Sequence, residues 1–162
     1  MTAIEAAVTI AAGVSAGLTG GVYLAFAAIV IPALRKLSVG EAISAMQSIN
    51  TSAVRFPFMI VFFGGALAAV AVIGSEIASG AIAQERPLRT IGAALALVSV
   101  GITVVRNVPL NTALASAAAF SPGASTAWDT FDSGWSLANG MRAIVAAAGC
   151  VALMASLARP LV

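Results

Sequence analysis

The spacing of charged residues limits the fold of this chain more than any other feature. No Asp, Glu, Lys or Arg occurs in residues 6–34, 56–75, 90–105 and 143–158. A helix needs about 20 mainly apolar residues to cross the hydrocarbon core of a bilayer, so the first two segments are long enough and the last two are short by about four residues. The spacing predicts an all-α, integral membrane four-helix bundle that forms a single domain over residues 1–162.

Composition excludes several other classes of protein. Charged residues make up 9% of the chain, against about 25% in a typical soluble domain. The chain has no His and a single cysteine, Cys150, so its own residues cannot form a disulfide, a zinc cage, a His-ligated haem or a Glu-x-x-His di-iron site. We therefore expect no metal and no cofactor. A net charge of +2 does not favour a nucleic-acid partner.

The expected spans and connections follow from these boundaries. The spans cover about residues 4–34, 56–77, 88–114 and 134–158, with an interfacial segment at 36–55 and a polar connection at 115–133. Ile43, Met46 and Ile49 recur at helical spacing, which predicts a short amphipathic helix between spans 1 and 2. The connection from Glu76 to Arg89, with Gly80 and Pro87, is expected to be a plain turn.

The distribution of basic residues predicts an orientation. Arg35, Lys36, Arg55, Arg106 and Arg142 lie on the side of the first and third connections, and Arg86, Arg89 and Arg159 lie on the other side. The positive-inside rule places the first side in the cytoplasm of a multi-pass cell-membrane protein, with both termini outside. Residues 1–5 lack the positive charge of a signal peptide, so we expect the first span to be retained.

Three glycines of the first span, Gly13, Gly17 and Gly21, share one helix face. Small residues at this spacing let helices approach closely in lipid. This pattern predicts a packing seam, with packing inside the bundle favoured and a homo-oligomer left open.

Polar residues also recur at helical spacing inside three spans, where they are costly and must face the bundle interior. They are Ser15, Thr19 and Tyr23 in the first span; Ser99, Thr103, Asn107 and Asn111 in the third; and Trp128, Asp132, Trp135, Asn139 and Arg142 in the fourth, if that helix begins near Ser125 as its N-cap. Bonds from hydroxyls to backbone carbonyls, and an interfacial tryptophan, are sufficient to explain Ser15, Ser99 and Trp128.

The two arginines that end the short spans need a stronger explanation. Because the third and fourth helices run antiparallel, Arg106 and Arg142 are expected at the same depth, facing one cavity. Pro109 should kink or end the third helix beside Arg106, Asn107 and Asn111. Such a segment could bind a phenol, quinone, enolate or carboxylate. Arg106 taken alone could equally be a snorkelling end-cap.

Several segments resemble the anthrone oxygenase-like family of small four-helix membrane proteins. The resemblance covers about residues 13–150 and is carried by residues 20–26, 31–34, 46–50, 56–59, 62–64 and 106–111, together with Trp135 and Arg142. It implies that Asn107, Pro109, Asn111, Trp135 and Arg142 belong to a shared motif. It also implies an activity, because characterised fungal relatives are associated with oxidation of an anthrone to an anthraquinone without an obvious metal or flavin.

Our leading hypothesis is a membrane oxidoreductase that acts on a small lipophilic, aromatic substrate able to form a phenolate or enolate. Asp132 or Tyr23 would be the base, and Arg106 and Arg142 would stabilise the anion. The expected substrate-binding residues are Asn50, Asn107, Asn111, Trp135 and Asn139.

Two other classes of protein remain possible. One is a non-catalytic membrane subunit, or a lipid or quinone binder, of a larger assembly. A transporter is disfavoured because the sequence shows no inverted repeat and a single broken helix.

Overall fold

The computed structural model describes residues 1–80 and 87–158, and these are helical or in short connections. The elements are α1 (Ala3–Ala25), η1 (Phe26–Val30), α2 (Ile31–Leu34), α3 (Val39–Ala53), α4 (Phe58–Ser79), α5 (Pro87–Ile102), η2 (Thr103–Asn107), α6 (Val108–Ala115) and α7 (Ala124–Leu157). Four continuous helical segments are long and apolar enough to cross a membrane, namely Ala3–Leu34, Phe58–Ser79, Pro87–Ala115 and Ala124–Leu157. The predicted all-α membrane bundle is therefore confirmed.

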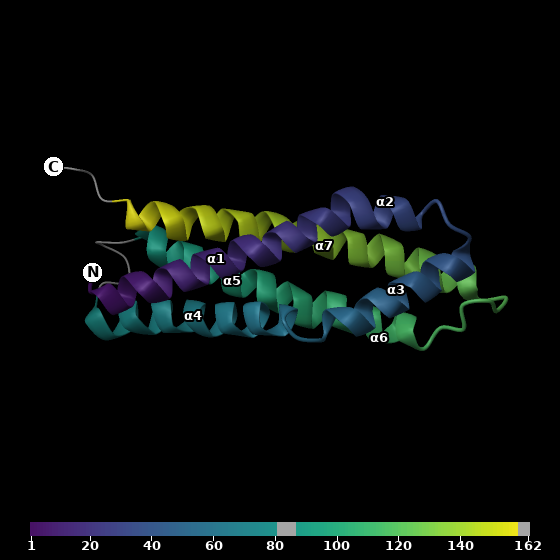
Figure 1. Ribbon diagram of the computed structural model, residues 1–162, viewed down its shortest axis with the longest axis horizontal. Helices are drawn as coiled ribbons and strands as arrows, with labels where there is room; N and C mark the ends of the chain where they lie inside the picture. The colour runs from purple at the N-terminus through teal and green to yellow at the C-terminus, as the bar shows by residue number, and fades with distance from the viewer. Residues whose placement is uncertain (81–86, 159–162) are drawn as a thin grey trace.

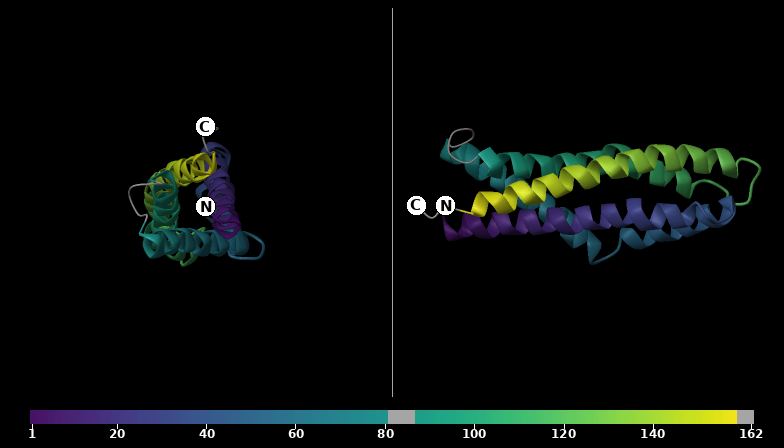
Figure 2. Two further views of the ribbon diagram at one scale, coloured as in Figure 1. Left: turned by 90° about the vertical axis from the view of Figure 1, so that its left-hand side faces the viewer. Right: turned by 90° about the horizontal axis from the view of Figure 1, so that it is seen from above.

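The four long helices lie side by side and form a ring in end view (Figures 1 and 2). α1 and α5 each pack against both α4 and α7. One end of the bundle, here called the terminal end, holds the start of α1 and the end of α7 (Figure 1). The opposite end, the connection end, holds α3 and the connection from α6 to α7.

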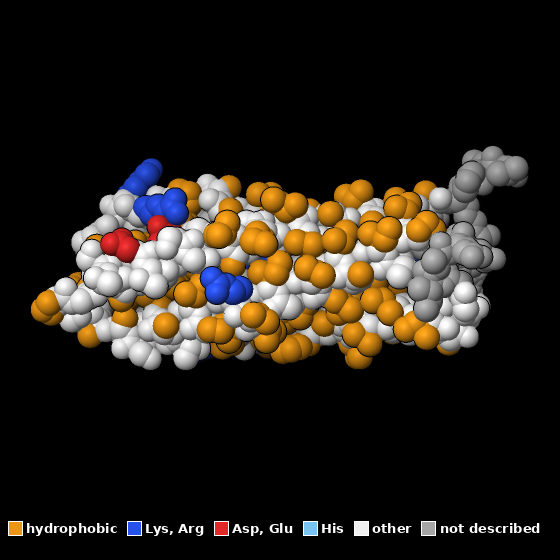
Figure 3. Space-filling view, turned by 180° about the vertical axis from the view of Figure 1, so that it is seen from behind, with side chains coloured by type: hydrophobic (Ala, Val, Ile, Leu, Met, Phe, Trp, Pro, Cys, Tyr) orange, Lys and Arg blue, Asp and Glu red, His pale blue; other side chains and the backbone are white. Residues whose placement is uncertain are grey.

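The outer surface is apolar over most of its length. Leu67, Val105 and Ile144 are each about 70% exposed, at 71%, 69% and 73%. In the view of Figure 3, the acidic side chains and most of the basic ones gather toward the connection end. Such a surface is suited to contact with lipid along the bundle and with water at its end.

The amphipathic helix predicted between spans 1 and 2 is present as α3. Its apolar side chains face inward, since Ile43 and Met46 are fully buried and pack in a cluster with Ile31 and Leu114. Ser38 and Glu41 form a capping box at its start, and these hydrogen bonds lower the pKa of the exposed Glu41 carboxyl. α3 is thus held against the bundle by its own hydrophobic face.

The plain turn that we predicted between Glu76 and Arg89 lies mostly in residues 81–86, outside the described residues, but both of its ends are described. Gly80 does end α4, in the left-handed conformation with φ 70° that glycine adopts at little cost. Glu76 and Arg89, however, lie within α4 and α5, where each is 1% exposed and the two form an ion pair. Arg89 Nε also donates to Thr9 Oγ1 at 2.9 Å. Because each helix extends past its charged residue, the two side chains turn inward and neutralise each other, a pairing that the sequence did not predict. Arg86 and Arg159, which entered the charge count, lie outside the described residues.

Two membrane-spanning helices contain a wide turn, although we expected only one broken helix. A proline follows two positions after the end of each π-helical segment, Pro32 after η1 and Pro109 after η2. Pro109 does not end its helix, which continues as α6 to Ala115. A proline ring clashes with the carbonyl four residues before it, and the wider turn accommodates that clash. Such π-turns often occur at functional sites.

Glycines determine how closely α7 approaches its neighbours. A Cβ atom on Gly92 would lie 3.0 Å from the carbonyl oxygen of Gly149, so α5 and α7 meet backbone to backbone. Gly13 and Gly17 face Met154 and Cys150 of α7. A Cβ atom added to Gly21, by contrast, would have no contact with another helix within 4 Å. Two of the three glycines of the predicted seam therefore pack inside the chain.

This close approach gives a first prediction. Gly92→Ala should lower the free energy of unfolding by about 1–3 kcal/mol, because the added methyl group meets backbone that cannot move aside. Gly101→Ala on the same helix is the matched control, since no atom lies within 4 Å of its Cβ position. Thermal unfolding of the two variants in detergent measures the difference. Equal stability of the two variants would show that the α5–α7 contact is looser than described.

Candidate ligand cavity

A cavity of about 470 Å³ opens within the bundle toward its connection end. Every long helix contributes to its wall, and α3 closes one side. The apolar wall includes Val22, Phe26, Ile49, Phe58, Met59 and Val108, and the polar side chains include Tyr23, Asn50, Thr103, Asn111, Trp135 and Arg142. This size and mixture are typical of a site for a small, mainly apolar ligand.

Helical spacing explains why these polar residues meet. In each span, residues three or four positions apart point to the same side. The helical spacing of the polar residues predicted that they face inward, and the structure buries four of them: Tyr23, Trp135, Asn139 and Arg142. The polar residues of the fourth span lie on one face without Ser125 as an N-cap, because α7 begins at Ala124 with Gly123 in the N-cap position.

Arg142 is the charged group at the centre of the site. Its side chain is 6% exposed, and its guanidinium donates to Asn139 Oδ1 through Nε (3.2 Å) and Nη2 (2.9 Å). Nη1 donates to Thr103 Oγ1 at 3.3 Å. The guanidinium carbon lies 4.0 Å from the ring centre of Tyr23 and 5.1 Å from that of Trp135. Amide, hydroxyl and aromatic groups thus hold the cation, and no carboxylate among the described residues is paired with it.

Three polar atoms of cavity-lining residues are buried without a hydrogen-bond partner. They are Nδ2 of Asn50, Oδ1 of Asn111 and Nε1 of Trp135. Leaving such an atom unpaired costs about 1–3 kcal/mol. Two donors and one acceptor that are unsatisfied beside a cavity are suited to a ligand that carries its own oxygen atoms.

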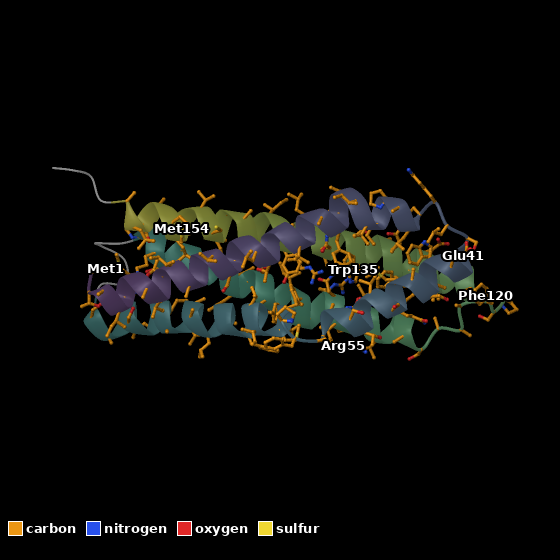
Figure 4. The ribbon with its side chains drawn as sticks, viewed as in Figure 1. Met1, Glu41, Arg55, Phe120, Trp135 and Met154 are labelled. Carbon is orange, nitrogen blue, oxygen red and sulfur yellow. The ribbon has the colours of Figure 1, made fainter. Side chains whose placement is uncertain are left out.

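Aromatic rings form one wall of the cavity. Trp135, which lies inside the bundle toward its connection end (Figure 4), has its ring centre 5.4 Å from that of Phe26 and 5.7 Å from that of Phe131. The ring of Phe131, which does not itself line the cavity, stacks on that of Trp135. A fixed aromatic wall of this kind favours a flat ligand.

Arg106 does not belong to this site, so the predicted pair of arginines facing one cavity is wrong. Its side chain is exposed on the outer face of η2, and it does not line the cavity. The physical reason is that adjacent helical residues point about 100° apart. Asn107 takes the inward position and is fully buried, so Arg106 faces outward.

Asp132 was one of the two candidate bases, but it does not line the cavity either. Its carboxylate accepts hydrogen bonds from Arg35 Nε (2.8 Å) and Arg35 Nη2 (3.0 Å), and a third from Ser136 Oγ (2.9 Å). This hydrogen bonding raises the pKa of Arg35. Asp132 therefore ties the end of α2 to α7, and Tyr23 is the candidate base that the structure places in the cavity wall.

Asn107 and Asn139 lie behind the cavity wall rather than in it. Asn107 Nδ2 donates to the backbone oxygen of Trp135 at 3.3 Å, and Asn139 Nδ2 donates to that of Tyr23 at 2.9 Å. Since Asn139 Oδ1 also accepts from Arg142, these two amides position the three side chains that do line the cavity. We had expected both to bind the substrate directly.

The contribution of α3 to the cavity was largely missed, since only Asn50 was assigned to the site. Gln47 holds this helix in place, because its Nε2 donates to the backbone oxygens of Leu114 (2.9 Å) and Ala117 (3.0 Å). Gln47 lies four positions after the inward-facing Ile43, and this spacing was the available signal, because it places the amide on the inward face. Within the described residues, no three His, Cys, Asp or Glu side chains are grouped so that they could hold a metal ion.

The fold and cavity define a class: a small four-helix membrane protein with an arginine-containing, mainly apolar cavity. The anthrone oxygenase family model matches residues 46–152, and the chain belongs to this family. No curated protein and no solved structure matches the chain. The matched region contains Asn50, Asn111, Trp135 and Arg142, whereas Tyr23 precedes it.

The unsatisfied amide of Asn111 gives a second prediction. Asn111→Leu should raise the free energy of unfolding by about 1 kcal/mol, because it removes a buried polar atom without a partner. The same variant should bind a flat aromatic ketone that carries a hydroxyl group at least about tenfold more weakly. Unfolding and titration with this ligand, followed by tryptophan fluorescence, measure the two effects. Thr112→Leu, at the exposed neighbouring position, should leave the binding of this ligand unchanged. A destabilised Asn111→Leu variant would contradict the description of this atom.

Proposed function

We propose that this protein is a membrane oxidoreductase that oxidises a lipophilic aromatic substrate with dioxygen, without a protein-ligated metal. The observation that carries the proposal is Arg142, a buried cation that pairs with no carboxylate of residues 1–80 and 87–158, beside the unsatisfied donors of Asn50 and Trp135. Membership in the anthrone oxygenase family supports an anthrone as the class of substrate.

The chemistry of an anthrone fits these groups. Its methylene group lies between two aromatic rings and opposite a carbonyl, so loss of a proton gives an enolate with charge on oxygen. Fixed donors in a water-poor site stabilise such an anion strongly. Arg142, Trp135 Nε1 and Asn50 Nδ2 would bind the enolate oxygen, and Asn111 Oδ1 would accept a hydrogen bond from a hydroxyl group on the substrate.

The overall reaction balances without another reductant, because one methylene group and one dioxygen molecule give one carbonyl group and one water molecule. The enolate carbon forms a bond to dioxygen, which gives a peroxide anion. The proton removed in the first step then returns to the terminal oxygen of this anion, and the product is a hydroperoxide. Cleavage of the O–O bond then gives the ketone, with that oxygen and two hydrogens leaving as water. The protein has to remove the first proton, hold the anion and exclude competing reactions.

Tyr23 is our candidate for the base. Its ring centre lies 4.0 Å from the guanidinium carbon of Arg142, and both side chains line the cavity, so the group that would take the proton lies beside the cation that would hold the anion. Asn139 donates to the backbone oxygen of Tyr23 and accepts from the guanidinium of Arg142. This amide therefore holds the two residues in a fixed relative position.

We also propose that the connection end lies in the cytoplasm and that the membrane is the cell membrane. Arg35, Lys36 and Arg55 are exposed at or near that end, which supports the orientation.

A second candidate is a quinone-binding protein without catalysis. The unsatisfied donors of Asn50 and Trp135 would bind quinone carbonyls equally well. Turnover distinguishes the two functions, because a binder would retain anthraquinone without converting anthrone.

Substitution of the two arginines tests the proposal. Arg142→Gln should lower the rate of anthrone oxidation about 100-fold or more, because it removes the charge that stabilises the enolate. Arg106→Gln is the matched control, since this side chain is exposed and does not line the cavity. Dioxygen uptake and anthraquinone formation by purified protein in detergent measure the rate, and thermal unfolding checks that both variants are folded. Equal rates for the two variants would remove Arg142 from the mechanism.

A further inference from the structure

The ligand cavity has an open side, and apolar side chains line its mouth. Three of the lining residues, Val22, Val54 and Val108, are exposed, at 37%, 67% and 47%. Trp135 and Arg142, which carry polar groups of the site, also line the cavity but are buried. A ligand that enters the cavity therefore passes apolar side chains first and reaches these polar groups last.

Packed apolar side chains separate the cavity from the connection end. Ile43 and Met46 of α3 meet Leu114 of α6 and Trp128 of α7 in one buried cluster. In each helix these residues lie on the connection-end side of the residues that line the cavity (Figure 1). The route along the bundle axis from that end is thus closed, so the mouth opens through the side of the bundle.

The mouth lies where α3 ends and α4 begins. Val54 directly follows α3, and Phe58 and Met59 form the start of α4; all three line the cavity. Ser48 and Ser52 of α3, which are also exposed, line it on the side toward the connection end. The mouth therefore has a polar edge toward the connection end and an apolar edge toward α4.

The length of α4 places this mouth in the membrane. α4 has 22 residues, which is about 33 Å at 1.5 Å per residue, and the hydrocarbon core of a bilayer is about 30 Å thick. Nearly the whole helix is needed to cross the core, so the first turn of α4 lies close to one edge of it. The large exposed side chains of α4 are apolar along its length: Ile60, Phe63, Leu67, Val70 and Ile77.

Two exposed arginines mark the same edge of the core. Arg55 lies three positions before the start of α4, and Arg106 comes about 28 Å along the helix from the start of α5. Long basic side chains at such positions extend to the headgroups. Figure 4 shows Arg55 and Trp135 at a similar level along the bundle, whereas Glu41 lies nearer the connection end. The mouth thus lies at the boundary between hydrocarbon and headgroups.

We propose that the ligand cavity opens sideways into the bilayer, and that a flat lipophilic ligand enters it from the membrane at the junction of α3 and α4. We call this opening the portal. Its apolar edge admits molecules dissolved in the hydrocarbon, and the two serines allow a polar group of the ligand to stay near the headgroups during entry. That the ligand is oxidised rests on the proposed function, whereas the portal rests on the geometry of the mouth.

Fluorescence quenching tests the portal without any turnover. Trp128→Phe leaves Trp135 in the cavity wall as the single tryptophan, and Trp135→Phe leaves Trp128, which is buried and does not line the cavity. Both variants are reconstituted in phosphatidylcholine vesicles and exposed to doxyl-labelled nonane, which dissolves in the bilayer, or to iodide, which stays in water. We expect the nitroxide to quench Trp135 several-fold more strongly than Trp128, and iodide to quench neither.

Two results would overturn the proposal. One is quenching of Trp135 by the nitroxide that is no stronger than that of Trp128, whether or not iodide reaches either residue. The other is quenching of Trp135 by iodide alone, which would show that the cavity opens to water. If the wild-type protein oxidises no substrate at all, the proposed function fails while the quenching experiment still decides on the portal.

A block at the mouth tests the position of the portal. In a Cys150→Ala background, Val54→Cys is labelled with benzylmaleimide after folding, and Ile60→Cys is the matched control, since Ile60 is exposed on α4 but does not line the cavity. The label at position 54 should lower the association rate of a hydroxyanthraquinone at least about tenfold, because it narrows the entry path. The label at position 60 should leave this rate unchanged. Stopped-flow tryptophan fluorescence measures the rate, and equal rates for the two labelled proteins would refute a portal at this junction.

Discussion

The structure depends on one constraint, which is the burial of the Arg142 charge inside an apolar bundle. A charged side chain in the bilayer region costs several kcal/mol unless the protein satisfies it. Here Asn139 and Thr103 accept from the guanidinium, and the rings of Tyr23 and Trp135 lie against it. These contacts come from α1, η2 and α7, so satisfying the cation also sets the relative position of three membrane-spanning segments. The remaining space beside the cation forms the ligand cavity.

The two ends of the bundle have different roles. At the terminal end, Glu76 and Arg89 neutralise each other, and the glycines of α5 and α7 bring the backbones into contact. Toward the connection end, the wide turns η1 and η2 occur just before Pro32 and Pro109, and α3 covers a space that the four long helices leave open. A tightly packed half thus supports a half with a cavity. Sites held by a rigid scaffold keep their groups in a fixed geometry, which a reaction that stabilises an anion requires.

Much of the fold could be predicted from the sequence because the cost of placing charge in lipid is large and local. The uncharged segments predicted four spans, and the periodic polar residues correctly predicted that Tyr23, Trp135, Asn139 and Arg142 face inward. The site was predicted less well, because charge spacing does not tell an end-cap from a buried group. Arg106 was taken as inward although Asn107 holds that position, and the pairing of Glu76 with Arg89 was not predicted. Asp132 was assigned as a base from its place among the periodic polar residues of the fourth span, but its carboxylate pairs with Arg35, 97 positions away along the chain. Tertiary pairing of this kind has no local signal.

The most direct test of the central claim is to identify what occupies the ligand cavity. Mass spectrometry of protein purified in mild detergent, compared with the Arg142→Gln variant, measures this without assuming a reaction. Our account predicts a flat aromatic compound that carries a carbonyl and a hydroxyl group, bound one to one and lost in the variant. A phospholipid bound equally by both proteins, with no aromatic compound in either, would contradict it.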